Sequence, residues 1–181
     1  PWTLPANEAV ALNGELDYVA ISISRAESDD TRGYSVILVL AADLADGCLK
    51  RYGATSDGVL ARFKGAALEG LRLRHPWRDK QVPVILGEHV TLDAGTGAVH
   101  TAPAHGQEDF LVGPRYGLPV INPVGPDGRF APDTELVAGM KVNDANAVII
   151  SELATGGRLL HQEAHQHSYP HCWRHKPPVI F

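Results

Sequence analysis

Alternating hydrophobic and polar positions predict several short strands along this chain. Asp17 to Ser24 alternates, and Tyr34 to Ala41 is almost wholly apolar, with a polar linker between them. A period of two is typical of a half-buried strand, and a short apolar run is typical of a buried one. We therefore expect a hairpin with a long tip. Further strands are predicted at Val59 to Ala66 and at Val82 to Val90, where Pro83 indicates an edge strand or a strand start.

Helical spacing of apolar residues appears in fewer places. Ala42 to Tyr52 predicts a short helix that ends near Gly53, and Asn143 to Leu153 predicts the clearest helix. Asn143 or Asp144 would cap the latter. With about three short helices among many strands joined by glycine-rich turns, we predict a mainly β fold of the α+β class, with peripheral helices around a β-barrel-like core. At 181 residues, a single compact domain over 1–181 is expected.

One stretch concentrates the candidate chemistry. Gly95 to Phe110 reads GTGAVHTAPAHGQEDF, which we interpret as a strand, a tight turn and a helix start. Alternation places Ala98, His100 and Ala102 on one face, so small side chains leave open space beside the imidazole. Asp109 falls in the first helical turn, where free N–H groups and the helix dipole favour its charged form and suit it to bind an ammonium group.

Each of these residues also has a plainer interpretation. Acidic residues begin many helices, and a histidine in a strand is often a hydrogen-bonded core residue. Pro1 to Asn7 is predicted to be extended because its prolines restrict the backbone, and Thr3 and Asn7 there are equally typical of a strand edge or turn.

Two other stretches are candidates for ligand binding. Leu71 to Lys80 surrounds Trp77 with cations that could face RNA, although such runs are usually solvated loops. Near Cys172, five of the nine histidines invite a zinc hypothesis, but Pro170 prevents one helix from aligning them, and we predict no metal site. The cations of the first stretch are Arg72, Arg74, His75, Arg78 and Lys80, and the histidines are His161, His165, His167, His171 and His175.

Composition and charge restrict the function classes. The net charge of −5 argues against strong autonomous nucleic-acid binding. No apolar run approaches the roughly 20 residues that cross a bilayer, so no membrane partner is expected. Two cysteines make no disulfide framework and suit a reducing, cytoplasmic compartment. The chain has no initiator methionine and ends on an apolar run, so we expect a fragment of a longer protein.

The stretch Gly95 to Phe110 resembles the signature of the editing domain of isoleucyl-tRNA synthetases. PWTLPAN at Pro1 to Asn7, NPVGPDGRF at Asn122 to Phe130 and HSYPHCWRHKPPVIF at His167 to Phe181 agree with it, so the resemblance spans the chain. The related valyl and leucyl domains share the glycine pair and the Pro-Ala-His turn. They do not carry the His-Thr-Ala-Pro run seen at His100 to Pro103.

This resemblance implies a compact, barrel-centred editing fold that belongs to a larger, ATP-binding synthetase. It implies hydrolytic proofreading, in which the valine ester is cleaved from isoleucine tRNA while isoleucine is excluded by size. A single methylene gives only modest discrimination, a problem for which the isoleucine enzyme is the standard example. The implied partners are the mischarged tRNA, valine and the catalytic body of the parent enzyme. A monomer is expected, and no cofactor is expected in this domain.

The resemblance also implies residue roles. Asp109 would bind the α-ammonium, His100 would lie near the ester and help exclude isoleucine, and Thr3 with Asn7 would orient the ribose or the attacking water. In the family a threonine-rich run leads into this motif, and only Thr3 of it is present here. The candidate catalytic residues are Asp109, His100 and Thr3, and the candidate substrate-binding residues are Trp2, Thr3, Asn7, His100, Thr101, Ala102 and Asp109.

Three other functions remain open from the sequence. The chain could be a valyl-type editing domain, which would remove threonine. It could be a tRNA-docking module without catalysis, because no G-x-S-x-G elbow is present and no general base is obvious. A metal-dependent hydrolase built on the histidine-rich stretch is the third.

Overall fold

The computed structural model describes residues 1–25, 34–163, 171–174 and 176. They form two compact units, each of which is described here by itself. The sheet unit comprises Glu8–Arg74 and Lys80–Thr101, and the helical unit comprises Pro1–Asn7, His75–Asp79 and Ala102–Phe181. Within the described residues, no helix combines the length and the apolar character needed to cross a membrane.

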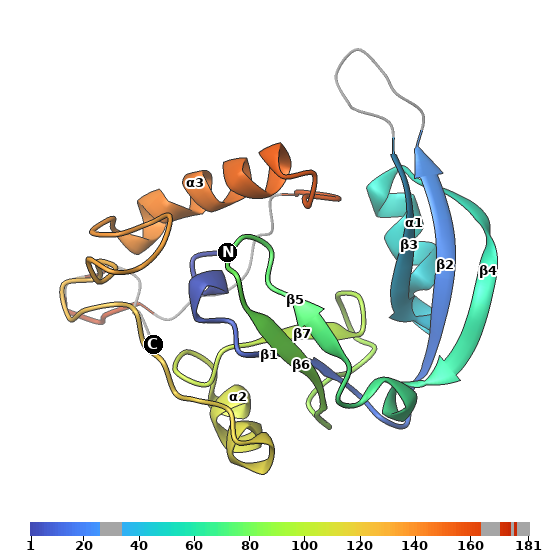
Figure 1. Ribbon diagram of the computed structural model, residues 1–181, viewed down its shortest axis with the longest axis horizontal. Helices are drawn as coiled ribbons and strands as arrows, with labels where there is room; N and C mark the ends of the chain where they lie inside the picture. The colour runs from blue at the N-terminus through green and yellow to red at the C-terminus, as the bar shows by residue number, and fades with distance from the viewer. Residues whose placement is uncertain (26–33, 164–170, 175, 177–181) are drawn as a thin grey trace. The chain divides into compact units, whose positions relative to one another are not determined.

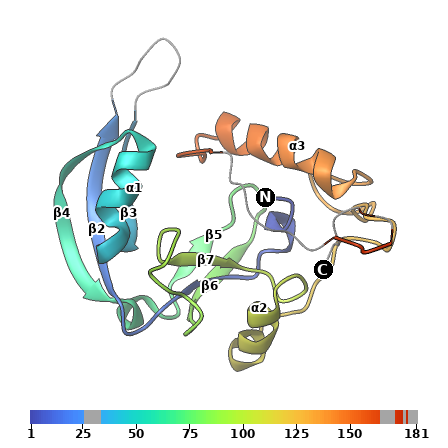
Figure 2. The same cartoon turned by 180° about the vertical axis from the view of Figure 1, so that it is seen from behind.

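A three-stranded antiparallel sheet forms one half of the sheet unit, in the order β3-β2-β4 (Figures 1 and 2). Its strands are β2 (Asp17–Arg25), β3 (Tyr34–Ala41) and β4 (Thr55–Lys64). The predicted β2–β3 hairpin is confirmed, and its tip, 26–33, lies outside the described residues. β4 begins before the predicted Val59 and gives way to a 3₁₀ turn at Gly65–Leu68.

A four-stranded sheet forms the other half, in the order β5-β6-β1-β7. Its strands are β5 (Arg72–Arg74), β6 (Gln81–Leu86), β1 (Ala9–Leu12) and β7 (Ala98–Thr101). β1 pairs in parallel with β6 and antiparallel with β7. The strand β1, which follows Asn7 closely in the sequence, therefore pairs with β7. Strand β7 lies within the stretch Gly95 to Phe110, which we call the central motif.

Pro83 marks neither an edge nor a strand start, because it is the third residue of β6 and β6 lies between β5 and β1. The parallel pairing with β1 begins at Val84, opposite Val10, so the missing N–H of Pro83 costs no bond in that ladder. β6 ends at Leu86, four residues before the predicted Val90.

The mainly β character with added helices is confirmed, but the barrel-like core is wrong. Both sheets are open, and no pairing between the outer strands β5 and β7 is recorded in the described part of the chain. Closure of a barrel requires its first and last strands to pair. Among the strand pairs of the described residues, only β1–β6 is parallel, so the unit is not a doubly wound sheet either.

Helix α1 (Ala45–Tyr52) ends where the sequence predicts. A 3₁₀ turn at Ala42–Leu44 precedes it, and Gly53 follows in the left-handed conformation with φ of 61°. Cys48 and Leu49 of this helix are buried.

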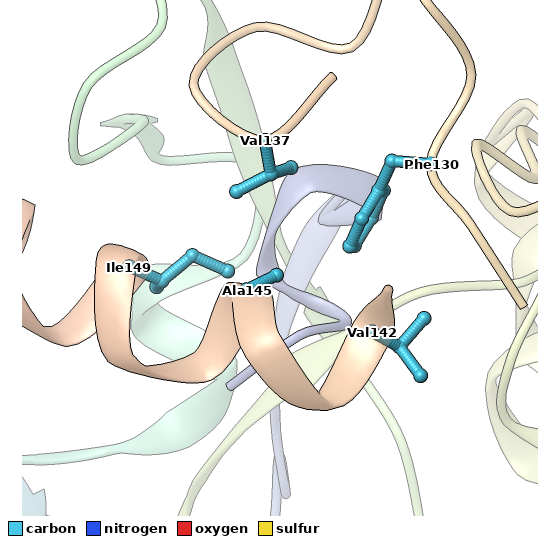
Figure 3. Close-up of a cluster of buried hydrophobic side chains, with 5 residues drawn as sticks. All are labelled: Phe130, Val137, Val142, Ala145 and Ile149. Carbon is cyan, nitrogen blue, oxygen red and sulfur yellow. The ribbon is translucent and has the colours of Figure 1, made fainter. Parts of the chain in front are cut away.

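Helix α3 (Val142–Thr155) carries the core of the helical unit (Figure 3). Its residues Val142, Ala145 and Ile149 pack with Phe130 and Val137. The predicted cap at Asn143 or Asp144 is wrong, because the helix begins at Val142, and Lys141 precedes it without a side-chain cap bond. Partly buried residues complete the cluster, namely Trp2, Leu4, Trp77, Val124, Met140, Val148 and Leu153.

The segment Pro1–Asn7 is not extended, contrary to its prediction. Leu4–Ala6 forms a 3₁₀ turn in which Pro5 lies in the first turn. A proline fits there because its fixed φ suits a helix and its missing N–H would have no partner in the first turn. The segment joins the core of its unit through Trp2 and Leu4.

Candidate functional site

Asp109 lies in the first turn of α2 (Gln107–Val112), as predicted. Its Oδ2 accepts a hydrogen bond of 2.8 Å from the backbone N–H of Ala102, so the side chain closes the turn that joins β7 to α2. Among the described residues, no other hydrogen bond or ion pair to Asp109 is recorded. One carboxylate oxygen is thus anchored, and no partner of the other is recorded within the described residues.

The Asp109 carboxylate lies so close to Gly106 that a side chain at position 106 would collide with it. A Cβ atom built on Gly106 would lie 2.6 Å from Asp109 Oδ2 and 2.8 Å from its Cγ. The φ of Gly106 is −120°, which any residue adopts, so the glycine serves close approach and not backbone conformation.

An open hollow of about 470 Å³ lies along the start of α2. It is lined by Gly106, Gln107, Glu108, Asp109 and Leu111. This volume falls within the range of small-molecule sites in proteins. Two carboxylates and one exposed leucine give the hollow a negative charge beside an apolar wall, which suits a ligand with both an ammonium group and an aliphatic part.

Trp2 contacts the turn that leads to Asp109. The ring centroids of Trp2 and His105 lie 5.0 Å apart with an interplanar angle of 73°, an edge-to-face arrangement. The backbone N–H of Trp2 also donates to Asn146 Oδ1 of α3 at 2.9 Å. The structure therefore brings the predicted segments PWTLPAN and AHGQED together within the helical unit.

Thr3 and Asn7 differ in accessibility. Thr3 is partly exposed, whereas Asn7 is only 4% exposed. Thr3 accepts a backbone bond from Ala6, and the N–H of Asn7 donates to Leu4. Thr3 is therefore the better placed of the two to contact a substrate, and Asn7 contributes mainly to the shape of its segment.

His100 and Thr101 belong to the sheet unit, in β7. They pair with Val10 and Ala9 of β1, and the N–H of Glu8 donates to the Thr101 carbonyl. β1 and β7 therefore enter and leave the sheet at the same end. His100 is partly exposed, whereas Thr101 is fully buried and its hydroxyl donates to its own strand.

The two alanines that flank His100 do not border an open space. Ala98 packs against the core cluster that contains Leu12 and Tyr18, and Ala102 is 1% exposed. The contribution of Ala102 to the site is its backbone N–H, which holds Asp109.

The glycine pair of the central motif is anchored by Tyr18, which sequence reasoning did not identify. The buried Tyr18 hydroxyl donates to the Gly97 carbonyl at 2.6 Å, and the N–H of Ala41 donates to the Thr96 carbonyl at 2.9 Å. Gly97 has a φ of 78°, and a Cβ on it would lie 2.4 Å from that of Ala41. Tyr18 thereby fixes the loop that leads into β7.

Replacing Tyr18 with phenylalanine should lower the free energy of unfolding by about 1–3 kcal/mol, because it leaves the Gly97 carbonyl without its donor. Burial raises the pKa of Tyr18, a change that its bond from Asn13 partly offsets. A raised pKa in the folded state adds stability below the unfolded value of about 10, and this contribution is lost as pH rises beyond it. Urea unfolding at pH 8 and above pH 10 measures both effects.

The matched control for this prediction is Tyr116→Phe, at a partly exposed tyrosine of the other unit. It should keep the wild-type loss of stability above pH 10. The same loss in Tyr18→Phe would assign the alkaline effect to other groups.

The stretch Leu71 to Lys80, the RNA-facing candidate of the sequence, is partly buried. His75 is 2% exposed, and Trp77 packs against the core cluster of the helical unit. Of the cations in this stretch, Arg72 and Arg74 on the outer strand β5 are exposed, and no ion pair to either is recorded in the described chain. In the sequence, Pro76 and Trp77 beside His75 were the features that could have indicated its burial.

A metal site finds no support in the described residues, where no three histidine, cysteine or acidic side chains gather. His161 lies 3.2 Å from Glu163, and no disulfide to Cys172 is recorded in the described residues. His165, His167 and His175 lie outside the described residues.

Residues 49–164 match the family described as leucyl-tRNA synthetase, editing domain. The chain belongs to this editing-domain family. Over all 181 residues it is 60% identical to the isoleucine–tRNA ligase of Methylococcus capsulatus and 55% identical to that of Thioalkalivibrio sulfidiphilus. It covers 18% of the length of each of these relatives. The resemblance to isoleucyl-type editing domains is therefore confirmed.

The fold agrees with this assignment. The crystal structure of GlLeuRS-CP1 superposes with a TM-score of 0.63 and 16% sequence identity, over 91% of this chain and 81% of that one. At that identity the similarity supports the fold of the editing domain and not its specificity.

Proposed function

We propose that this editing domain hydrolyses the ester bond between valine and isoleucine tRNA, as the proofreading part of a larger isoleucine–tRNA ligase. The observation that carries the proposal is Asp109, whose carboxylate is anchored through one oxygen beside an open hollow. The relatives with the highest quoted identity, which are isoleucine–tRNA ligases, support the choice of tRNA.

Asp109 binds the α-ammonium group of the esterified amino acid. An ammonium group has three donors, and a charge-assisted bond to the unanchored carboxylate oxygen fixes the adjacent ester carbonyl. Holding the ester in one orientation lowers the entropic cost of attack by water. The hydrogen bond from the Ala102 N–H restricts the movement of the Asp109 side chain, so the bound ammonium group is held in one place.

Water is the nucleophile in this proposal. An aminoacyl ester is already a reactive acyl donor, so a positioned water with modest acid–base assistance suffices. Thr3, which is partly exposed, orients that water or the terminal ribose with help from Asn7. His100 acts near the ester and the bound side chain, and Trp2 is the remaining proposed substrate contact. Because Thr101 and Ala102 are buried, they shape the site and do not contact the substrate.

The tRNA is held mainly by the parent synthetase, since a domain with a net charge of −5 attracts phosphates weakly. The domain needs no cofactor for hydrolysis, and the ATP-dependent chemistry belongs to the parent. We propose a monomeric cytoplasmic enzyme, in which both cysteines stay reduced.

The test is deacylation of isoleucine tRNA charged with valine or with isoleucine, by the full-length parent enzyme. We expect the valine ester to be hydrolysed at least about tenfold faster, because a pocket that fits valine clashes with the extra methylene of isoleucine. Chelator should leave the rate unchanged.

Three outcomes would contradict the proposal. Equal hydrolysis of both esters would contradict exclusion by size, and hydrolysis of threonine esters on valine tRNA alone would identify a valyl-type domain. Binding of charged tRNA without any hydrolysis would identify a docking module.

A further inference from the structure

The 3₁₀ turn Leu4–Ala6 lies between the proposed substrate residues Thr3 and Asn7, and its backbone needs outside support. Such a short turn makes few internal bonds, here from Ala6 N–H to Thr3 and from Asn7 N–H to Leu4. The carbonyls of Leu4 and Pro5 both receive further donors from His75–Asp79, a segment more than 70 positions away in the sequence. These contacts lie within the helical unit.

His75 supplies the first donor. Its Nε2 lies 3.2 Å from the Leu4 carbonyl oxygen, and its Nδ1 lies 3.2 Å from the backbone N–H of Arg78 and 3.4 Å from that of Trp77. Because backbone N–H groups donate to Nδ1, that nitrogen carries the lone pair and Nε2 carries the proton. The buried imidazole is therefore a neutral donor to Leu4.

Arg78 supplies the second donor. Its Nη1 donates to the Pro5 carbonyl at 2.9 Å, and its Nε lies 3.8 Å from Glu135 Oε2. The Arg78 side chain is 37% exposed, so the ion pair contributes little energy by itself. Its effect is to orient the guanidinium toward Pro5.

Packing holds this segment against the turn. The rings of His75 and Trp77 lie 4.8 Å apart and nearly perpendicular, and Trp77 shares the core cluster with Trp2 and Leu4. The two carbonyl contacts therefore start from a backbone that the core already holds in place.

We infer that His75 and Arg78 are positioning residues for the editing reaction, which hold the Leu4 and Pro5 carbonyls and thereby fix Thr3. This inference rests on the proposed function. Neither residue touches the substrate. A site preorganised in this way spends no binding energy on ordering Thr3, and small displacements of such a group reduce rates strongly.

The experiment uses two matched substitutions of His75 in the full-length parent enzyme. His75→Asn keeps an acceptor near the position of Nδ1 but removes the donor to Leu4, whereas His75→Gln places an amide donor near the position of Nε2. We expect His75→Asn to lower kcat for deacylation by about 10- to 100-fold with KM nearly unchanged, and His75→Gln to restore part of the loss. Aminoacylation should stay at the wild-type rate.

Arg78→Ala tests the second contact, with Arg158→Ala as its control. Arg158 is an exposed arginine of the same unit beyond α3, and its removal should leave deacylation unchanged. Arg78→Ala should lower kcat, and Arg78→Lys should restore part of it. A salt-dependent rise in KM with unchanged kcat would overturn the inference, because it would make Arg78 a phosphate contact.

Hydrogen exchange at the Asn7 amide, which donates to Leu4, separates positioning from fold stability. We expect faster exchange there in His75→Asn, with unchanged far-UV circular dichroism. A deacylation rate of His75→Asn that returns to the wild-type value on cooling would overturn the inference, because it would indicate a loss of fold stability. Faster exchange with an unchanged kcat would overturn it while leaving the proposed function intact. A wild-type enzyme without deacylation would instead overturn the proposed function, and the inference with it.

Discussion

Replacing Asp109 with alanine should reduce hydrolysis of the valine ester by about 100-fold, since it removes the charge that orients the substrate. The substitution also removes the acceptor of the Ala102 N–H, which donates a hydrogen bond to Asp109 Oδ2 in the structure. Single-turnover deacylation by the full-length parent enzyme, measured over a range of tRNA concentrations, checks this prediction.

Asp109→Asn separates the two effects of that substitution. Asparagine keeps the side-chain oxygen that can accept from Ala102 but loses the negative charge that binds an ammonium group. We expect a melting temperature close to that of the wild type and a rate nearly as low as that of Asp109→Ala. If the asparagine variant hydrolysed the ester at the wild-type rate, Asp109 would serve the turn and not the substrate.

Local structure in this domain follows from short stretches of sequence. β3 spans Tyr34–Ala41 as predicted, because an apolar run of strand-forming residues needs little outside information. The start of α2 after Gly106 was equally predictable, since the acidic residues that follow favour a first helical turn. The position of Asp109 was therefore visible in the sequence, but its bond to Ala102 was not.

Long-range pairing could not be predicted in the same way. The bond between Tyr18 and Gly97 joins positions 79 apart, and that between His75 and Leu4 joins positions 71 apart. Nothing in a local window specifies such partners. Whether a set of strands closes into a barrel also depends on pairing between strands that are distant in the sequence. Local patterns do not specify this pairing, so the sequence did not distinguish the expected barrel from the two open sheets that are observed.

Composition misled the sequence analysis at Leu71 to Lys80. A run of cations usually indicates an exposed surface, but His75 is buried as a neutral hydrogen-bond donor, and the guanidinium of Arg78 is held by Pro5 and Glu135. A residue that can carry charge is assigned to the surface by its type, whereas its burial depends on whether the fold supplies partners.

Gly106→Ala should impair the editing site while leaving the fold nearly intact. The new Cβ would lie 2.6 Å from Asp109 Oδ2, so the carboxylate must move away from its bond with the Ala102 N–H. Alanine is a poorer residue than glycine before a helix, which adds a loss of stability of about 1 kcal/mol or less. We expect deacylation to fall by about 10- to 100-fold, because the ammonium contact is displaced. Parallel measurements of deacylation and urea unfolding test the expected dissociation of rate from stability.

Gly47→Ala provides the matched control for the same glycine-to-alanine change. A Cβ at Gly47 meets no atom within 4 Å, and the residue lies within α1, where alanine is favoured over glycine by about 0.5–1 kcal/mol. This variant should be slightly more stable than the wild type and fully active. Because the two substitutions add the same methyl group, a loss of activity confined to Gly106→Ala would trace the effect to the Asp109 carboxylate. Equal activity in both variants would show that hydrolysis does not depend on where that carboxylate is held.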